Sequence, residues 1–268
     1  MFKLISVNQL ILQTIKIYQK NLKIIFKILS LLIAPILVLR LLFHYANLQF
    51  LEIFYALLFG ALAALLGIVV KIMIIYLIPP ASASSDDQVA SVARLRTPQF
   101  KNLFKQSIRK SLSYIWIVVI TTFITLSVPL FGNALLGFDL ANYYNYLIYF
   151  IIILWSFIFS LLFVFVIYGL VLANKKGLSA IFYSKDLVLK SPLEIAFKII
   201  ILLLFFGAWL ILLSMLINSV IAVFIGQFDQ LARGLPWWAN ITVDLCAILG
   251  LPFLIIGGGL LFQSAEGK

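Results

Sequence analysis

The sequence predicts an all-α integral membrane protein that crosses a bilayer about six times. Its 268 residues are 64% hydrophobic and only 11% charged, with a mean hydropathy of +1.16, whereas soluble domains are about half apolar and a quarter charged. A helix needs ~20 mostly apolar residues to cross ~30 Å of hydrocarbon. Runs near or above that length predict spans at 28–46, 49–78, 112–131, 145–172, 193–224 and 241–263. They are apolar on all sides, which argues against the alternating strands of a barrel.

A basic amphipathic stretch precedes the first predicted span. Its polar residues are spaced four and three apart in turn, so they share one face of a helix. A helix of this composition lies in the plane of the lipid headgroups, with its apolar face toward the acyl chains. The same lysines interrupt any continuous apolar core of a signal peptide, so the first span is expected to stay in the mature protein. The polar face comprises Gln9, Gln13, Lys16, Lys20, Lys23 and Lys27.

Similar stretches precede the third and fifth spans. The middle one sets Lys101, Lys105 and Arg109 against apolar residues, and the last ends at Lys190 before a Ser191–Pro192 turn. We therefore predict one polytopic domain of three units, each an interfacial helix followed by two spans. The alternative is that the basic stretches simply extend the spans into the cytoplasm. The predicted units are 1–80, 97–172 and 177–263, with a flexible linker at 81–96.

The net charge of +11 predicts anionic lipid headgroups as partners. Nearly all lysines and arginines lie in the N-terminal segment and in loops 79–111 and 173–192, whereas the opposite loops contribute only Arg40 and Arg233. The positive-inside rule then places both termini in the cytoplasm of a plasma (bacterial inner) membrane. Nucleic acid is not an expected partner, because this basic charge flanks membrane spans instead of covering a soluble face. The predicted headgroup contacts are Lys16, Lys20, Lys23, Lys27, Lys101, Lys105, Arg109 and Lys190.

The segment 169–192, GLVLANKKGLSAIFYSKDLVLKSP, resembles the membrane domain found in some bacterial glycerophosphodiester phosphodiesterases and in stand-alone membrane proteins. In that family a span is followed by a polar turn, an interfacial helix and a further span. The two earlier basic stretches are similar to the family's other interfacial helices. The resemblance implies the three-unit architecture but no phosphodiesterase activity, because the catalytic barrel and its metal ligands are absent. The matching positions are Ala180, Ser184, Asp186, Leu187, Val188 and Lys190.

Residues suited to catalysis are scarce. The chain has one histidine and one cysteine, Cys246, so it cannot form an intrachain disulfide or a multi-cysteine metal cluster. No zinc-protease, P-loop, nucleophile-elbow or dinucleotide motif occurs. We therefore expect no catalytic, metal or cofactor residues. The leading hypothesis is a non-enzymatic membrane protein that organises the envelope or assists a membrane protein partner, and the alternative is a small-molecule transporter or lipid translocator.

Some charged residues are expected within the membrane. Five of them gather near the outer span ends, where Arg40 or Arg233 is expected to pair with Glu52 or Asp244 because an unpaired charge is costly there. Such a cluster would bind a lipid headgroup or gate a transport path. The alternative is that these are ordinary charges at helix ends. Lys71 in span two is expected to snorkel toward headgroups, with an anion contact as the alternative. The outer cluster comprises Arg40, His44, Glu52, Arg233 and Asp244.

Small residues and prolines give two further predictions. In span two, Gly60 with Ala64 and Ala63 with Gly67 form small-xxx-small pairs, which predict close helix packing. In span six, three consecutive glycines follow Pro252 and predict a kink of the type that transporters use.

Overall fold

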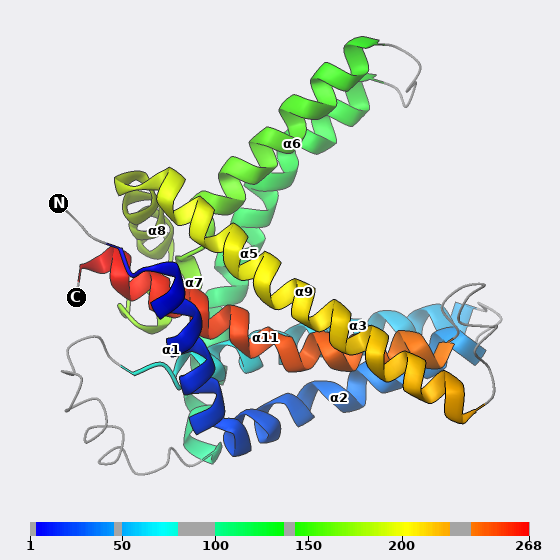
Figure 1. Cartoon of the computed structure of the whole chain (residues 1–268). Helices are drawn as coiled ribbons and strands as arrows, with labels where there is room; N and C mark the ends of the chain where they lie inside the picture. Colours follow the sequence, from blue (N-terminus) through cyan, green and yellow to red (C-terminus); the bar gives the residue numbers. More distant parts are fainter. Residues whose placement is uncertain (1–3, 46–49, 80–99, 137–142, 226–236, 268) are drawn as a thin grey trace.

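The computed structural model describes residues 4–45, 50–79, 100–136, 143–225 and 237–267, and these residues form helices and turns without a strand (Figure 1). Six of the helical segments are long and apolar enough to cross a bilayer, with α6 and α7 forming one of them. This confirms the predicted all-α polytopic class. The helices are α1 Val7–Lys20, α2 Leu22–Tyr45, α3 Phe50–Ile75, α5 Phe100–Leu136, α6 Tyr143–Phe163, α7 Val166–Val171, α8 Leu178–Lys190, α9 Pro192–Phe224 and α11 Trp237–Glu266.

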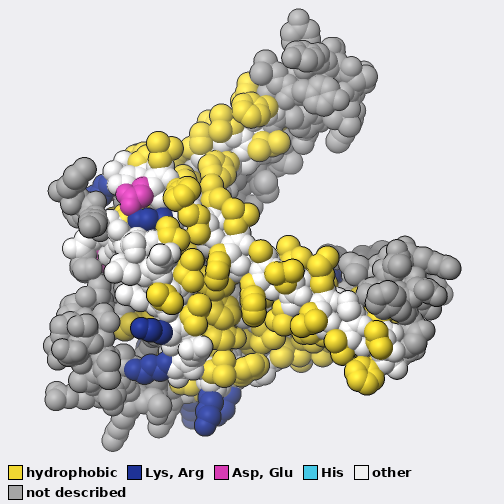
Figure 2. All heavy atoms as spheres, in the orientation of Figure 1, with side chains coloured by type: hydrophobic (Ala, Val, Ile, Leu, Met, Phe, Trp, Pro, Cys, Tyr) yellow, Lys and Arg dark blue, Asp and Glu magenta, His cyan; other side chains and the backbone are white. Residues whose placement is uncertain are grey.

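The long helices are arranged in two arms (Figure 1). The bundle arm contains α2, α3, α9 and α11, and the hairpin arm contains α5 and α6. The arms meet at one end of the molecule, where both termini, α1, α7 and α8 also lie. Lysines and arginines gather there on the face that Figure 2 shows, and we call this the basic end. The hairpin arm diverges from the bundle arm toward the opposite end, which we call the far end.

Helix α11 forms the centre of the bundle. Of its span residues 61% are buried, against 17–33% in the other five spans. Near the basic end it is tied to three distant parts of the chain. The Ile5 amide donates to Ser264 Oγ (2.7 Å), Gln263 Nε2 donates to the Pro79 carbonyl (2.8 Å), and the Tyr168 hydroxyl donates to the Ile255 carbonyl (2.9 Å). The last turns of α11 therefore hold α1, the end of α3 and α7 together.

The three glycines of α11 serve packing. A Cβ at Gly257 would lie 3.0 Å from Leu202, one at Gly258 would lie 2.4 Å from Tyr168 Oη, and one at Gly259 would lie 2.2 Å from Ile78 Cδ1. The helix continues through all three residues and through Pro252. The predicted kink at Pro252 stays a prediction, because the continuous helix does not decide whether its axis bends. The missing side chains let neighbouring helices come close to the α11 backbone.

The small residues of α3 behave in the opposite way. A Cβ added at Gly60 or Gly67 would meet nothing within 4 Å, and Ala64 is exposed. The predicted close packing at these positions does not occur within the described chain. The residues of α3 that do pack lie near the basic end, where Val70, Ile72 and their neighbours are fully buried.

The basic stretch forms a separate helix in the third unit and, as far as Lys20, in the first. Lys23 and Lys27 lie in the first turns of α2, so this part of the predicted interfacial helix belongs to the span helix. Between α1 and α2 the chain turns at Asn21, whose side chain donates to the Ile17 carbonyl (3.0 Å). Between α8 and α9 it turns at Ser191, before the proline at the start of α9. In the middle unit, α5 is one continuous helix from the basic stretch into the span. No glycine or proline occurs between Phe100 and Pro129 to interrupt it, so here the stretch extends the span.

The two separate amphipathic helices each pack one face on the protein. In α1, Leu10 and Thr14 are buried and Tyr18 stacks on Phe253 of α11 with ring centroids 4.0 Å apart. Its lysines are exposed, and so is Leu12, which lies one turn before Lys16. In α8, Ala180, Ser184, Leu187 and Val188 are buried, whereas Leu178 and Phe182 remain exposed. The apolar residues therefore divide between the protein core and an outward face.

Ser184 of α8 holds the break between α6 and α7. Its Oγ donates to the Leu162 carbonyl (2.7 Å) and accepts from the Phe165 amide (3.1 Å). We expect Ser184→Ala to lower the free energy of unfolding by about 1–3 kcal/mol, because it leaves a buried amide without a partner. Denaturant unfolding in mixed micelles measures this. Ser160→Ala, at an exposed position of α6, is the matched control and should change stability little; equal losses would contradict the assignment.

Candidate functional site

The predicted headgroup contacts lie at the basic end and are all exposed. Seven of them have no side-chain hydrogen bond or ion pair within the described part of the chain. Their charges are therefore available to ligands outside the protein. The seven are Lys16, Lys20, Lys23, Lys27, Lys101, Lys105 and Arg109; the eighth predicted contact, Lys190, has an interaction within the structure.

Lys198 is a buried lysine that the sequence analysis missed. It lies near the start of α9 with 5% of its surface exposed, and its Nζ donates to Glu194 Oε1 at 2.5 Å. A buried ammonium needs such a partner because desolvation is costly. The sequence signal was the Glu-to-Lys spacing of four residues on one helix. Lys198 and Glu194 neutralise each other, so this pair is not a candidate binding site for a charged ligand.

A second group of lysines that the sequence analysis missed surrounds the α7–α8 turn. Lys110 of α5 donates to the Leu170 carbonyl (3.0 Å) and to Asn174 Oδ1 (2.5 Å). Lys175 and Lys176 follow Asn174 in the turn and are exposed. Lys110 resembles its basic neighbours in sequence, and only the fold brings it to this turn.

Tyr183 lies next to this turn and links α8 to α11. The Lys175 ammonium lies over its ring, 5.1 Å from the centroid, and the Tyr183 hydroxyl donates to Glu266 Oε1 (2.6 Å). Burial raises the pKa of the Tyr183 hydroxyl well above its ordinary value, and the bond to Glu266 raises this pKa further. Tyr183 therefore remains a neutral donor at physiological pH.

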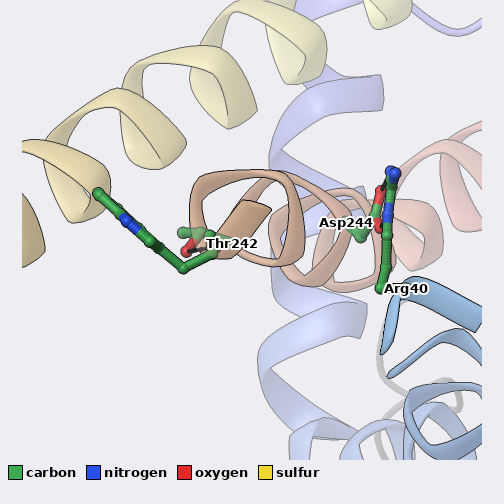
Figure 3. A network of polar contacts seen from close by, with 4 residues as sticks. Arg40, Thr242 and Asp244 are labelled. Carbon is green, nitrogen blue, oxygen red and sulfur yellow. Dashed lines mark hydrogen bonds and ion pairs between the residues drawn. The ribbon is translucent and has the colours of Figure 1, made fainter. Parts of the chain in front are cut away.

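Toward the far end, Arg40 of α2 pairs with Asp244 of α11 (Figure 3). Arg40 Nε donates to Asp244 Oδ2 (2.5 Å) and Nη2 donates to Oδ1 (2.9 Å). This bidentate geometry is the strongest that the two side chains can form. Arg40 or Arg233 was predicted to pair with Glu52 or Asp244, and the structure confirms the pair of Arg40 with Asp244. Two residues before Asp244 on the same helix, Thr242 donates to the Trp238 carbonyl (3.2 Å).

The side chains of the remaining members of the predicted outer cluster lie outside the described residues. His44 and Glu52 lie in α2 and α3, but their side chains are outside the described residues, and Arg233 is outside them altogether. The linker 81–96 is outside them as well. Lys71 is half-buried about one turn before α3 ends, without a hydrogen bond to a described residue. Its snorkelling and its anion contact both stay predictions.

Among the described residues, no group of three histidine, cysteine, aspartate or glutamate side chains is close enough to hold a metal ion. Cys246 is buried in α11. Comparison of the chain with protein-family models, with curated proteins and with solved structures finds no match in any of the three.

Proposed function

We propose that this polytopic membrane protein is a non-enzymatic, anionic-lipid-binding protein of the plasma (inner) membrane, with the basic end on the cytoplasmic side. The observation that supports this most is the set of seven exposed lysines and arginines at that end, which have no partner among the described residues. Each basic residue near an anionic surface is worth about 1 kcal/mol of attraction.

The non-enzymatic part of the proposal rests on how the span charges are used. Arg40 is bonded to Asp244, and Lys198 is bonded to Glu194. Each of these charges has an opposite charge as its partner within the protein, which offsets part of its desolvation cost and gives it a structural role. The likeness of segment 169–192 to a phosphodiesterase membrane domain stays a prediction from the sequence. An accessory role beside a membrane protein partner is part of the same proposal.

Lipid retention tests the proposed function. The protein is extracted with a neutral detergent, equilibrated with equal phosphatidylglycerol and phosphatidylcholine, and weighed by native mass spectrometry. We expect phosphatidylglycerol to be retained preferentially. Replacing Lys16, Lys20, Lys23 and Lys27 by glutamine should lower that preference by about tenfold or more, whereas arginine at the same positions should preserve it. Equal retention of both lipids by the unchanged protein would overturn the proposal.

The proposed orientation has its own test. Both termini are at the basic end (Figure 1), and the positive-inside rule assigns that end to the cytoplasm. In cells producing Cys246→Ser protein, an impermeant thiol reagent should label a cysteine at position 142 and spare one at position 85. Labelling of both positions from the same side would contradict the topology, and the reverse pattern would contradict the orientation.

A second candidate function is lipid translocation, which is favoured by the opening between the arms. Figure 2 shows a V-shaped opening whose visible walls carry hydrophobic side chains. Exposed apolar residues are numerous on α6 and α9, among them Phe150, Trp155, Phe205 and Trp209. The test uses vesicles that contain the protein and a fluorescent lipid, to which dithionite is added from outside. A translocator would carry inner-leaflet lipid to the outer leaflet, where dithionite quenches its fluorescence. Quenching restricted to the outer-leaflet share would exclude this function and leave the first one standing.

A further inference from the structure

The α7–α8 turn brings three lysines together from two parts of the chain. Lys175 and Lys176 are consecutive in the turn, and Lys110 reaches it from α5 through its bonds to Leu170 and Asn174. Lys176 is close enough for its charge to act on the Lys110 ammonium. Like charges in proximity repel one another, and an anion between them would offset that repulsion.

None of the three ammonium groups is neutralised by a carboxylate in the described part of the chain. Lys110 donates to a carbonyl and an amide oxygen, which are both uncharged, and an ammonium has three donors. Lys175 contacts an aromatic ring. The nearby carboxylate of Glu266 accepts the Tyr183 hydroxyl. Lys110 therefore retains one donor and its whole charge for a further acceptor.

Several hydrogen bonds hold the turn that carries Lys175 and Lys176. Asn174 has a φ of +54° and Gly177 a φ of +52°, the left-handed region that costs a non-glycine residue energy. The bond from Lys110 to Asn174 offsets this cost. The Lys175 amide donates to the Gly169 carbonyl (3.0 Å), and the Lys176 amide donates to Ser179 Oγ (3.1 Å). A turn fixed in this way loses little entropy when it binds a ligand.

We propose that Lys110, Lys175 and Lys176 form a binding site for one phosphate group. The phosphate belongs either to a phospholipid headgroup or to a soluble phosphate, since both present the same oxygens to the lysines. This inference deepens the proposed function and rests on it for the choice of an anionic lipid. Exposed Leu178 and Phe182 on the adjoining α8, with 56% and 57% of their surfaces free, offer a surface for acyl chains and favour the lipid.

The experiment compares two pairs of charge removals in the full chain. Lys175→Gln with Lys176→Gln removes two lysines of the site, and Lys101→Gln with Lys105→Gln removes two exposed lysines of α5. Each pair of substitutions lowers the net charge of the protein by two, because two lysines become glutamines. In titrations with phosphatidylglycerol by native mass spectrometry, we expect the tightest bound copy to weaken about tenfold or more in the first pair and severalfold less in the second. Arginine at 175 and 176 should restore it.

The outcomes separate this site from the general proposal. If phosphatidylglycerol is preferred and both glutamine pairs weaken it equally, the charge acts diffusely and the site is overturned while the proposed function stands. If no anionic lipid is preferred at all, the proposed function falls, and inorganic phosphate titrated into lipid-free protein decides the site. Phosphate binding lost in the first pair would assign the site to soluble phosphate, and no phosphate binding would overturn it. Unchanged thermal unfolding of both pairs excludes a folding effect.

Discussion

Gly258→Ala is expected to lower the free energy of unfolding by about 2–4 kcal/mol, from overpacking together with the loss of a buried hydrogen bond. The added methyl would lie 2.4 Å from Tyr168 Oη and 3.0 Å from its Cζ. Tyr168 is buried and its ring packs against Phe165 and Phe262, with centroids 6.3 and 6.0 Å away. The ring cannot move without breaking the bond to the Ile255 carbonyl. Denaturant unfolding in mixed micelles measures the effect.

Gly67→Ala is the matched control, because it makes the same chemical change in a membrane helix where a Cβ meets nothing within 4 Å. It should leave stability unchanged or raise it by up to about 1 kcal/mol through helix propensity. Adding Tyr168→Phe to Gly258→Ala removes the closest contact and should recover part of the loss. Equal stabilities for the two alanine variants would show that α11 is not packed as described.

Arg40→Leu is the second substitution with a large expected effect, about 2–3 kcal/mol of destabilisation, because it leaves Asp244 charged and alone within a span. The Asp244 side chain is 25% exposed and short, whereas that of Arg40 is 42% exposed and long. An unpaired arginine can extend toward the headgroups. Asp244→Leu should therefore cost less, about 1 kcal/mol after allowing for this exposure.

A double-mutant cycle checks the assignment. Arg40→Leu combined with Asp244→Leu should be more stable than Arg40→Leu alone, because no uncompensated charge remains. The measurement is the same denaturant unfolding, carried out on all four proteins. Additive losses would mean that the two residues stabilise the bundle separately and that the bidentate pair has no energetic role.

The sequence predicted the helical class well because the bilayer imposes a simple requirement. Long apolar runs and the basic residues beside them are visible without any knowledge of packing. The turn at Ser191 also followed from the proline after it. The turn at Asn21 did not, because it divides the stretch that was predicted as one helical face and leaves Lys23 and Lys27 in α2. The continuous α5 did not, because a basic stretch of the same composition forms either a separate helix or an extension, depending on whether a residue interrupts it.

Helix packing was much harder to predict than helix position. A membrane helix that is apolar on all sides gives no periodic signal of which face meets protein and which meets lipid. The glycines of α3 and α11 look alike in sequence, yet Gly67 faces open space and Gly258 faces Tyr168. The same difficulty applies to Lys110, whose partners Leu170 and Asn174 are far away in the sequence. It also applies to Lys198, because the sequence does not show that this side chain is buried. The pairing of Arg40 was easier, because few opposite charges occur at its depth.

The central position of α11 has a consequence for biogenesis. This helix follows the others along the chain, and the Ile5 amide bonds to Ser264, 259 residues away. During translation the earlier helices enter the bilayer before the helix that they surround has been made. Their inner faces must then be covered by lipid, by each other or by an insertase until α11 arrives. Its insertion is therefore the step that completes the core, and a ribosome stalled before α11 should leave a chain that is protease-sensitive although its earlier spans are in place.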